Sequence, residues 1–414
     1  WEERTRYIKE HFGIGGMSLG DRLYEGHNAK GLEIKLGSLL NPDDKVMLTW
    51  RSVTERLALL YRQEIVAARE PEKTETPELN MEPVSYRIPE AQQIPTPRGP
   101  KARYRDNLDA IRTLKAVETE GRYASPEEQE VLAQYVGWGG LADAFDPGKD
   151  SWKEEYTALK ELLTDEEYAA ARASTLTAFY TPPMVIGAMH TALHNMGFTS
   201  GNLLEPACGT GRFFGLLPES MQAAHLYGVE LDSVSGRIAQ LLHPQAHIEI
   251  KGYEQADLPD QFFDAAVGNI LFGSFSVADP RYDAQHFLIH DYFFAKTLDK
   301  VRPGGVVAFI TSKGTLDKES PAVRRYLAQR AELIGAIRLP NDTFRAEAGA
   351  DVTSDILFLQ KRERPIVTDP DWVYLDTTPD GLTVNAYFVE HPDMVLGELV
   401  ETTTQYGKDI TCKP

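Results

Sequence analysis

The chain lacks cysteine pairs and long apolar runs. Its 414 residues include two cysteines, Cys208 and Cys412, and neither belongs to a CxxC pair. This shortage excludes a disulfide framework and a thiolate zinc site. No run of about 18 apolar residues occurs, and no basic, apolar and small-residue leader opens the chain. We therefore expect a cytoplasmic protein with no membrane contact.

Positive charge is also scarce, because 43 Lys and Arg face 62 Asp and Glu, a net charge of −19. Contacts to nucleic-acid phosphates need clustered Lys and Arg, so any DNA contact has to be local. The basic residues cluster in three places: Arg98, Lys101, Arg103 and Arg105; Lys313 and Lys318; and Arg324, Arg325 and Arg330. For any single cluster, a solvated face is the favoured interpretation.

The residue patterns divide the chain into five stretches. We expect a small accessory module at 1–76, a proline-rich linker at 77–106, a helical region at 107–176, a catalytic domain at 177–362 and a C-terminal extension at 363–414. Ser125-Pro126-Glu127-Glu128 and Thr164-Asp165-Glu166-Glu167 each predict a helix start. The first residue is Trp1 rather than Met, and the last residues close no recognisable element, which indicates a piece of a longer polypeptide.

From Pro182 onward, short apolar runs alternate with helical segments, which predicts a parallel sheet with crossover helices. We place strands at Asn202–Leu204, Leu226–Glu230, Ile248–Lys251, Asp264–Gly268, Val306–Thr311, Ile334–Arg338 and Asp355–Gln360. Helices are expected between them at Ser233–Leu242, His290–Val301 and Ala322–Arg330. In such sheets ligands bind at the carboxyl ends of the strands, so the residues after each strand are the candidates for chemistry.

A glycine loop follows the first predicted strand, with the sequence Glu205-Pro206-Ala207-Cys208-Gly209-Thr210-Gly211. Two glycines one residue apart let the backbone turn sharply and approach a ligand closely. The third glycine of a dinucleotide fingerprint is absent, since residue 214 is Phe, and Glu205 would repel a pyrophosphate. A ligand without phosphate and with a cationic end fits better, and S-adenosylmethionine is such a ligand.

Acidic residues also follow the second and third strands. Glu230 stands at the separation from the glycines at which a carboxylate meets ribose hydroxyls. Asp232 is expected to cap the helix that begins at Ser233 instead. Glu254 is a candidate acceptor for the adenine amine of the cofactor, and an exposed loop acid is a nearly equal alternative.

The fourth strand ends in Asn269-Ile270-Leu271-Phe272. An amine on an aromatic base is a poor nucleophile because its lone pair is delocalised into the ring. The Asn269 side-chain oxygen and the Ile270 carbonyl can each accept one amine hydrogen, which favours attack on a methyl group. Phe272 can stack on a base that has left the duplex, a contact of about 1–3 kcal/mol. Taken alone, the tetrapeptide also fits an ordinary strand end.

The order and spacing of Phe179-Tyr180-Thr181-Pro182, the Glu205–Gly211 loop, Glu230 and the Asn269–Phe272 segment resemble the adenine-N6 DNA methyltransferases. The resemblance implies an α/β, Rossmann-like, S-adenosylmethionine-dependent fold with a seven-stranded, mostly parallel sheet. It also implies DNA as substrate, with the target amine handled by Asn269, Ile270 and Phe272 and no metal. The implied cofactor residues are Phe179, Tyr180, Thr181, Glu205, Ala207, Gly209, Gly211, Glu230, Leu231 and Glu254.

A closer likeness covers most of the chain. The Gly13–Gly16 turn, the Tyr135–Gly140 run, His290–Lys296 and Ile310–Thr315 look like the methyltransferase portion of large proteins of conjugative elements and phages. Those proteins usually join a methyltransferase to a helicase. The likeness implies that a helicase region continues the full-length protein and that methylation protects mobile DNA against restriction.

Two departures separate the chain from that family. The usual Asn-Pro-Pro-Tyr/Phe signature is here Asn-Ile-Leu-Phe, and without proline, which fixes φ, the loop is expected to be softer. Little sequence follows the last strand, so target recognition is expected from 1–174, from the Ser274–Asp283 loop, or from another part of the full-length protein.

Three interpretations therefore stand beside each other. The leading one is adenine-N6 methylation of DNA, and the others are methylation of a glutamine amide in a protein and a catalytically weakened module that binds cofactor or DNA. His286 and His290, four residues apart, resemble a metal pair on a helix. No third ligand is spaced to join them, so a metal site is disfavoured.

Overall fold

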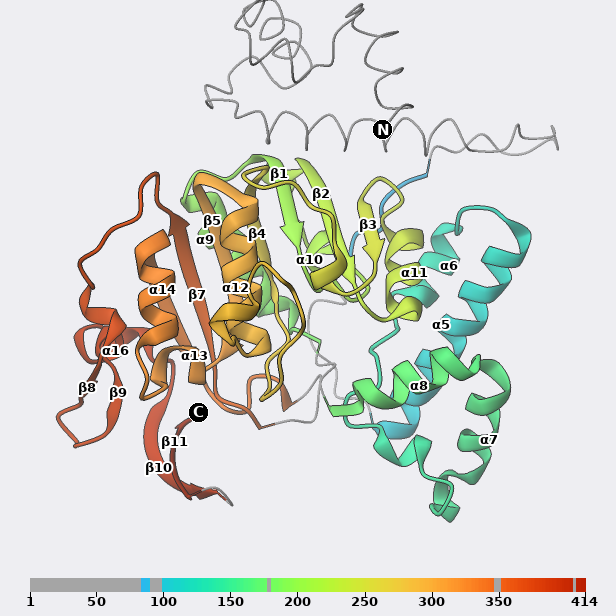
Figure 1. The fold of residues 1–414 in the computed structure, drawn as a ribbon. Coiled ribbons are helices and arrows are strands. Elements are labelled where there is room, and N and C mark those ends of the chain that lie inside the picture. Colours follow the sequence, from blue (N-terminus) through green and yellow to red (C-terminus); the bar gives the residue numbers. More distant parts are fainter. Residues whose placement is uncertain (1–82, 90–98, 177–179, 346–350, 405–406) are drawn as a thin grey trace, which may run out of the picture. The chain divides into compact units, whose positions relative to one another are not determined.

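The computed structural model describes residues 83–89, 99–176, 180–345, 351–404 and 407–414 (Figure 1). The expected accessory module at 1–76 lies outside these ranges, as does Phe179. No helix within the described ranges has the length and apolar character that a bilayer crossing requires.

A seven-stranded sheet forms the centre of the described chain, in the order β3-β2-β1-β4-β5-β7-β6. Its strands are β1 (Ser200–Glu205), β2 (Ala223–Glu230), β3 (His247–Ile250), β4 (Phe263–Asn269), β5 (Val301–Ser312), β6 (Ala331–Leu339) and β7 (Ser354–Lys361). The first five strands are parallel, whereas β7 pairs antiparallel with both β5 and β6. All seven predicted strands are present, and the predicted Rossmann-like fold with a mostly parallel sheet is confirmed.

Crossover helices cover the sheet because their apolar faces pack on the strands. They are α9 (Pro183–Asn195), α10 (Arg212–Gly215), α11 (Ser233–Leu242), α12 (Ile289–Lys300), α13 (Gly314–Asp317) and α14 (Ala322–Arg330). The predicted helix at Ser233–Leu242 has the observed bounds, and so does the one at Ala322–Arg330. Buried Ile186, Met189 and Leu193 of α9 join strand residues such as Leu203 and Val267 in one core.

The helical region before the sheet consists of α5 (Pro100–Glu120), α6 (Pro126–Leu132), α7 (Lys153–Leu162) and α8 (Asp165–Ala173). Helices α6 and α8 begin where predicted, and their N-caps, Ser125 and Thr164, form capping boxes. The first helix begins at Pro100, inside the stretch expected to be a linker, because proline suits the first turn of a helix. The expected start at Asn107 is therefore wrong.

The helical region and α11 share one apolar core. Val234, Ile238 and Leu242 of α11 are buried with Ile111, Leu114 and Trp138. Arg237 of α11 adds ion pairs to Glu118, at 2.9 Å, and to Glu167. The helical region is therefore attached to the helix that follows the candidate ribose acid, Glu230.

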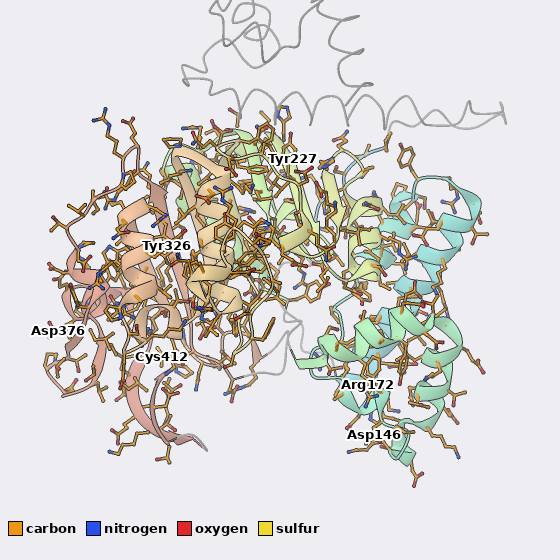
Figure 2. All side chains as sticks on the ribbon, in the orientation of Figure 1. Asp146, Arg172, Tyr227, Tyr326, Asp376 and Cys412 are labelled. Carbon is orange, nitrogen blue, oxygen red and sulfur yellow. The ribbon has the colours of Figure 1, made fainter. Side chains whose placement is uncertain are left out.

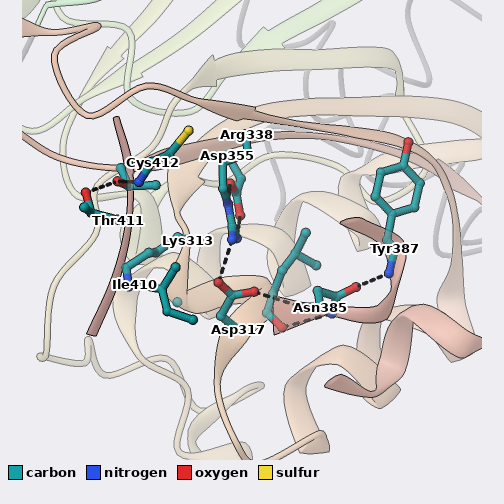
Figure 3. Close-up of polar contacts among 12 residues, drawn as sticks. Lys313, Asp317, Arg338, Asp355, Asn385, Tyr387, Ile410, Thr411 and Cys412 are labelled. Carbon is teal, nitrogen blue, oxygen red and sulfur yellow. Dashed lines mark hydrogen bonds and ion pairs between the residues drawn. The ribbon is translucent and has the colours of Figure 1, made fainter. Parts of the chain in front are cut away.

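The C-terminal extension contains the pair β8 (Leu375–Thr377) and β9 (Thr383–Asn385), α16 (Ala386–Glu390) and the hairpin β10 (Glu398–Thr404) and β11 (Gly407–Lys413). Figure 3 shows how buried polar groups attach it to the sheet. The Arg338 guanidinium binds the Asp355 carboxylate through two hydrogen bonds of 2.8 and 2.9 Å and reaches Asp317 at 2.8 Å.

Asp317 in turn accepts the Asn385 N–H at 3.0 Å, and the Asn385 side-chain amide donates to the Leu316 and Trp372 carbonyls. Asp317 thus links β6 and β7 to β9. Removing Arg338 from this network would leave the buried Asp355 carboxylate without its ion-pair partner, at a cost of about 3–5 kcal/mol.

Candidate active site

The candidate site lies at the carboxyl ends of β1 and β4, where the strand order reverses direction. Chain order runs outward from β1 to β2 and β3 on one side and from β4 to β5 on the other. Open parallel sheets bind ligands at such a switch point. In the register of the two strands, Leu204 lies beside Ala266, so Glu205 and Asn269 end neighbouring strands.

The glycine loop adopts a conformation that needs its glycines. Gly209 and Gly211 have φ of +54° and +78°, in the left-handed region that other residues rarely adopt. A Cβ on Gly211 would also lie 2.5 Å from Cδ2 of His243. Burial lowers the pKa of His243 to about 4, so the ring is neutral where it packs beneath the loop. The sequence contains no signal for His243.

Cys208, between these glycines and β1, has a packing role. Its N–H donates to the Val229 carbonyl at 3.0 Å, and its side chain is buried. Cys208 Sγ occupies the space that a Cβ on Gly228 would need, at 2.8 Å. The contact fastens the loop to β2. Ala207, one residue earlier, is half-exposed.

Glu205 ends β1 with its carboxylate in the interior. Its side chain is buried, and Oε2 has no hydrogen-bond partner. Its Cγ lies 3.5 Å from the position of a Cβ on Gly268, one residue before Asn269. Burial and the nearby Glu230 carboxylate raise the pKa of Glu205 well above its usual value. Such a carboxylate is costly without a partner and suits a cationic ligand group.

Glu230 ends β2 and faces the same loop. Its carboxylate accepts the Gly209 N–H and the Asp232 N–H, each at 2.8 Å. A carboxylate has about four acceptor positions, so these two bonds leave capacity for hydroxyl groups. Burial, followed by the charge of Asp232, raises the pKa of Glu230 to about 7.

Two other predicted cofactor residues lie around this loop. The Tyr180 hydroxyl lies 3.6 Å from the position that a Cβ on Gly209 would take. Burial and then the Glu230 charge raise the pKa of Tyr180 above its usual value. Thr181 is buried, and its carbonyl accepts from Arg212 at 3.2 Å.

Leu231, Asp232 and Glu254 follow the second and third strands. Asp232 caps α11 by accepting the Ser235 N–H at 2.9 Å, as predicted. Leu231 is an apolar side chain that is 67% exposed beside Glu230. Glu254 is half-buried, and its carboxylate leaves no room for a Cβ on Gly252. Leu231 and Glu254 thus follow the carboxyl ends of β2 and β3, the edge at which open parallel sheets bind ligands.

Asn269 is the last residue of β4 and pairs in register with Ile310 of β5. Ile270, which is 1% exposed, donates its N–H to the Ile310 carbonyl at 3.2 Å. A proline at this position would have no N–H to donate. The hydrogen bond fixes the chain directly after Asn269, so the expected softening does not begin at Ile270. Phe272 is half-buried.

The segment after Phe272 is fastened to α12 by groups that the sequence analysis missed. Asp279 Oδ2 accepts from the Tyr292 hydroxyl at 2.7 Å and from Lys296 Nζ at 3.1 Å. Lys296 also donates to the Glu254 carbonyl at 3.3 Å. Tyr292 and Lys296 belong to the run His290–Lys296, which the family resemblance had already singled out. No motif in the sequence indicated a role for Asp279.

Members of each basic cluster make contacts within the chain. Lys101 pairs with Glu155 at 2.5 Å, Lys318 with Asp291 at 2.6 Å and Arg325 with Asp369 at 2.7 Å. Lys313 pairs with Asp409, and the Arg330 guanidinium lies 3.6 Å from the ring centre of Tyr326, which Figure 2 labels on α14. These pairings favour structural roles for the clusters. Arg98 lies outside the described ranges.

The two histidines do not share a helix face. His286 precedes α12 in a left-handed turn, with φ of +51°, whereas His290 lies in the first turn of that helix. Within the described part of the chain, no three His, Cys, Asp or Glu side chains are grouped so that they could hold a metal ion.

The site fits the cationic, phosphate-free cofactor that its sequence predicts. A buried carboxylate with an unpartnered oxygen, Glu205, lies beside a glycine loop with little side-chain bulk. A second carboxylate, Glu230, has acceptor capacity left, and apolar Leu231 is exposed next to it. These groups match, in order, an amino group, ribose hydroxyls and a purine ring of S-adenosylmethionine.

The family model described as N-6 DNA Methylase matches residues 160–378. The chain is 29% identical over 261 residues to "Defense against restriction protein B" of Escherichia phage P1, a match that covers 62% of this chain and 10% of that protein. It is 27% identical over 220 residues to "Type II methyltransferase M.XamI" of Xanthomonas campestris pv. amaranthicola, covering 47% of this chain and 41% of that enzyme. The chain thus spans less than half the length of either relative.

Among solved structures, a Listeria monocytogenes protein assigned to the class I S-adenosylmethionine-dependent methyltransferases is 15% identical, with a TM-score of 0.41 over 65% of this chain and 90% of that one. The M protein of the type I restriction enzyme EcoKI is 18% identical, with a TM-score of 0.36 over 61% of this chain and 60% of that one. The cofactor of this family is S-adenosylmethionine. The chain belongs to the N-6 DNA Methylase family.

Proposed function

We propose that the chain transfers a methyl group to the N6 amine of adenine in DNA. The observation that carries the proposal is the position of Asn269, which ends β4 beside the strand that ends in the buried Glu205. An amide at that position lies next to the groups that fit the cofactor. The family match supports DNA as the substrate.

Each site residue has a role in this proposal. Glu205 holds the cofactor's amino group, the Gly209 and Gly211 backbone admits its methionine end next to Tyr180 and Thr181, and Glu230 accepts its ribose hydroxyls. When bound, S-adenosylmethionine supplies the methyl group. Ala207 and Leu231 line the pocket, and Glu254 receives the cofactor's adenine amine.

The target amine is activated by hydrogen-bond acceptors rather than by a strong base. Asn269 Oδ1 and the Ile270 carbonyl each accept one amine hydrogen, which localises the nitrogen lone pair as the transition state forms. The Ile270 N–H bonds to the Ile310 carbonyl, which fixes the peptide unit between Asn269 and Ile270, directly before this carbonyl. Phe272 stacks on the base once it has left the duplex.

We propose further that the chain is the methyltransferase part of a longer protein of a mobile element and protects that element's DNA against restriction. The likeness to the phage P1 protein, of which the match covers 10%, supports this role. A helicase region in the same polypeptide is the partner that the sequence resemblance implies.

The test offers tritium-labelled S-adenosylmethionine with unmethylated duplex DNA, single-stranded DNA and a cell extract. We expect label in DNA, identified as N6-methyladenine after digestion to nucleosides, and a loss of at least about 100-fold in rate with Asn269→Ala. Asn341→Ala is the matched control, because Asn341 follows β6 at the same rim outside the site. Label only in protein would support the glutamine alternative, and cofactor binding without any label would support a weakened module.

A further inference from the structure

Two backbone hydrogen bonds hold the first residues of the segment that connects β4 to α12. At one end the Ile270 N–H donates to Ile310, and at the other the Phe275 carbonyl accepts the Ile289 N–H at 2.8 Å. Ile270 and Phe272 lie within this span, and Asn269 directly precedes it. The backbone of Phe275 is therefore fixed against the first turn of α12, three residues beyond the residue that stacks on the target base.

Farther along, the same segment is fixed again at Asp279. The two groups that hold the Asp279 carboxylate, Tyr292 and Lys296, are both buried on α12. Tyr282 adds a hydrogen bond of 2.7 Å from its hydroxyl to Asp299 on the same helix. With its backbone fastened on both sides, Phe275 has a defined position at the rim.

The side chain of Phe275 is nevertheless exposed. It is 43% exposed, and among the described residues it is the one phenylalanine with a strongly exposed ring. Exposed Tyr123 and Tyr374 carry hydroxyls that water or a partner can satisfy, whereas a phenylalanine ring has no polar atom. The Phe275 ring packs against Gly273, where a Cβ would lie 2.9 Å from it. One part of the ring thus rests on backbone and the rest faces solvent.

Flipping a base out of duplex DNA leaves a gap in the base stack and unpairs the opposite base. Apolar side chains that enter such a gap restore stacking contacts and offset part of the cost. Phe275 combines the required features: an uncharged flat ring, a fixed backbone, and a place next to the residues that bind the extruded base.

We propose that Phe275 contacts the duplex at the position vacated by the target adenine and stabilises the flipped state. This inference rests on the proposed function, because it presupposes a duplex DNA substrate. Phe275 acts on the step before methyl transfer, so its importance depends on how firmly the target adenine is paired. A base that has no partner needs less help to leave the stack.

The experiment uses two duplexes, made once the modified adenine has been located in the wild-type product. One has thymine opposite the target adenine and the other has an abasic position. We expect Phe275→Ala to lower kcat/KM about tenfold on the paired duplex, which is within the range for losing one base–aromatic stacking contact, and less than about threefold on the abasic duplex. Phe275→Trp should retain most of the paired rate, and 2-aminopurine at the target should brighten with wild type and less with Phe275→Ala.

Tyr374→Ala is the matched control, since it removes a ring that is 45% exposed in the C-terminal extension. Equal losses on both duplexes, or no loss on either, would overturn the role of Phe275. The proposed function has a separate outcome: wild-type protein that labels no DNA defeats it before any Phe275 variant is made.

Discussion

The cofactor side and the target side of the candidate site differ in how far contacts within the protein fix their side chains. On the cofactor side, Glu205 and Glu230 are held by neighbouring strands, and Gly209 is bonded to Glu230. On the target side, the chain is fastened by its backbone, but the Phe275 ring faces solvent. Under the proposed function, the groups that bind the cofactor are therefore already positioned, whereas the target side presents apolar surface for DNA to cover.

Under the proposed function, this contrast predicts where each kind of specificity resides. Recognition of the cofactor depends on buried charge, whose effect is strong because water is excluded. Recognition of the target depends on stacking and on the energy of leaving the duplex. Variants on the cofactor side should change cofactor affinity with every DNA substrate, and variants on the target side should depend on the state of the DNA.

The largest effect on the cofactor side is expected from Glu205→Gln. The variant keeps the shape but removes the charge, and loss of a charge-assisted hydrogen bond in a buried site should weaken cofactor affinity about 100-fold in calorimetry. The same substitution should raise the Tm of the cofactor-free protein, because an unpartnered buried carboxylate destabilises the fold. Affinity and stability should thus move in opposite directions.

Glu249→Gln is the control for that experiment. Glu249 lies on β3 and is paired with Lys251 at 2.8 Å and with His247 at 3.6 Å. Burial raises the pKa of Glu249, but these two partners outweigh it and lower the pKa to about 2. Its loss should lower Tm and leave cofactor affinity unchanged. If Glu205→Gln lowered Tm as well, the Glu205 carboxylate would have a structural partner and our assignment to the cofactor would be wrong.

A smaller effect is expected from pH, through Glu230. Its pKa rises from an ordinary 4.5 to about 7 in the folded, cofactor-free protein. The protonated form is therefore favoured by folding, so this group's contribution to stability is fully present below pH 4.5 and is lost as pH rises through 7. Ribose hydroxyls need the ionised acceptor, so cofactor affinity should rise over the same interval, by about tenfold from pH 6 to pH 8.

Glu230→Gln should flatten both pH profiles, and Glu230→Ala should weaken cofactor binding more than about tenfold at pH 8. The measurements are Tm and calorimetric affinity at several pH values. An unchanged affinity in Glu230→Ala would remove the residue from the site. If Tm and cofactor affinity still depended on pH in Glu230→Gln, the titrating group would be Glu205 instead.

The strands and the glycine loop could be predicted from sequence because local patterns determine them. Buried parallel strands need continuous apolar runs, and the loop needs glycine at Gly209 and Gly211, where φ is positive. The seven strands and the cap at Asp232 follow from these rules. The same reasoning failed at Pro100, because proline marks both linkers and helix starts.

Contacts between residues far apart in the sequence could not be predicted. His243 packs beneath Gly211, and Asp279 is held by Lys296, only because the fold brings these residues together. A further example is the backbone bond from Ile270 to Ile310, which no side-chain pattern reveals. The missing proline indicated a soft loop, whereas the structure supplies a hydrogen bond that proline could not make.

The smallest effect should come from replacing the Ile270–Ile310 hydrogen bond with a proline, which fixes φ instead. Ile270→Pro restores a proline after Asn269 and removes the N–H that binds Ile310, so unfolding free energy should fall by about 1–2 kcal/mol. Proline fixes φ at this position, so turnover on DNA should stay within about threefold of wild type. Ile270→Val, which keeps the N–H and trims the side chain, separates the bond from the packing. A loss of turnover beyond about tenfold in Ile270→Pro alone would show that the bond to Ile310, rather than a fixed φ, aims the carbonyl at the target amine.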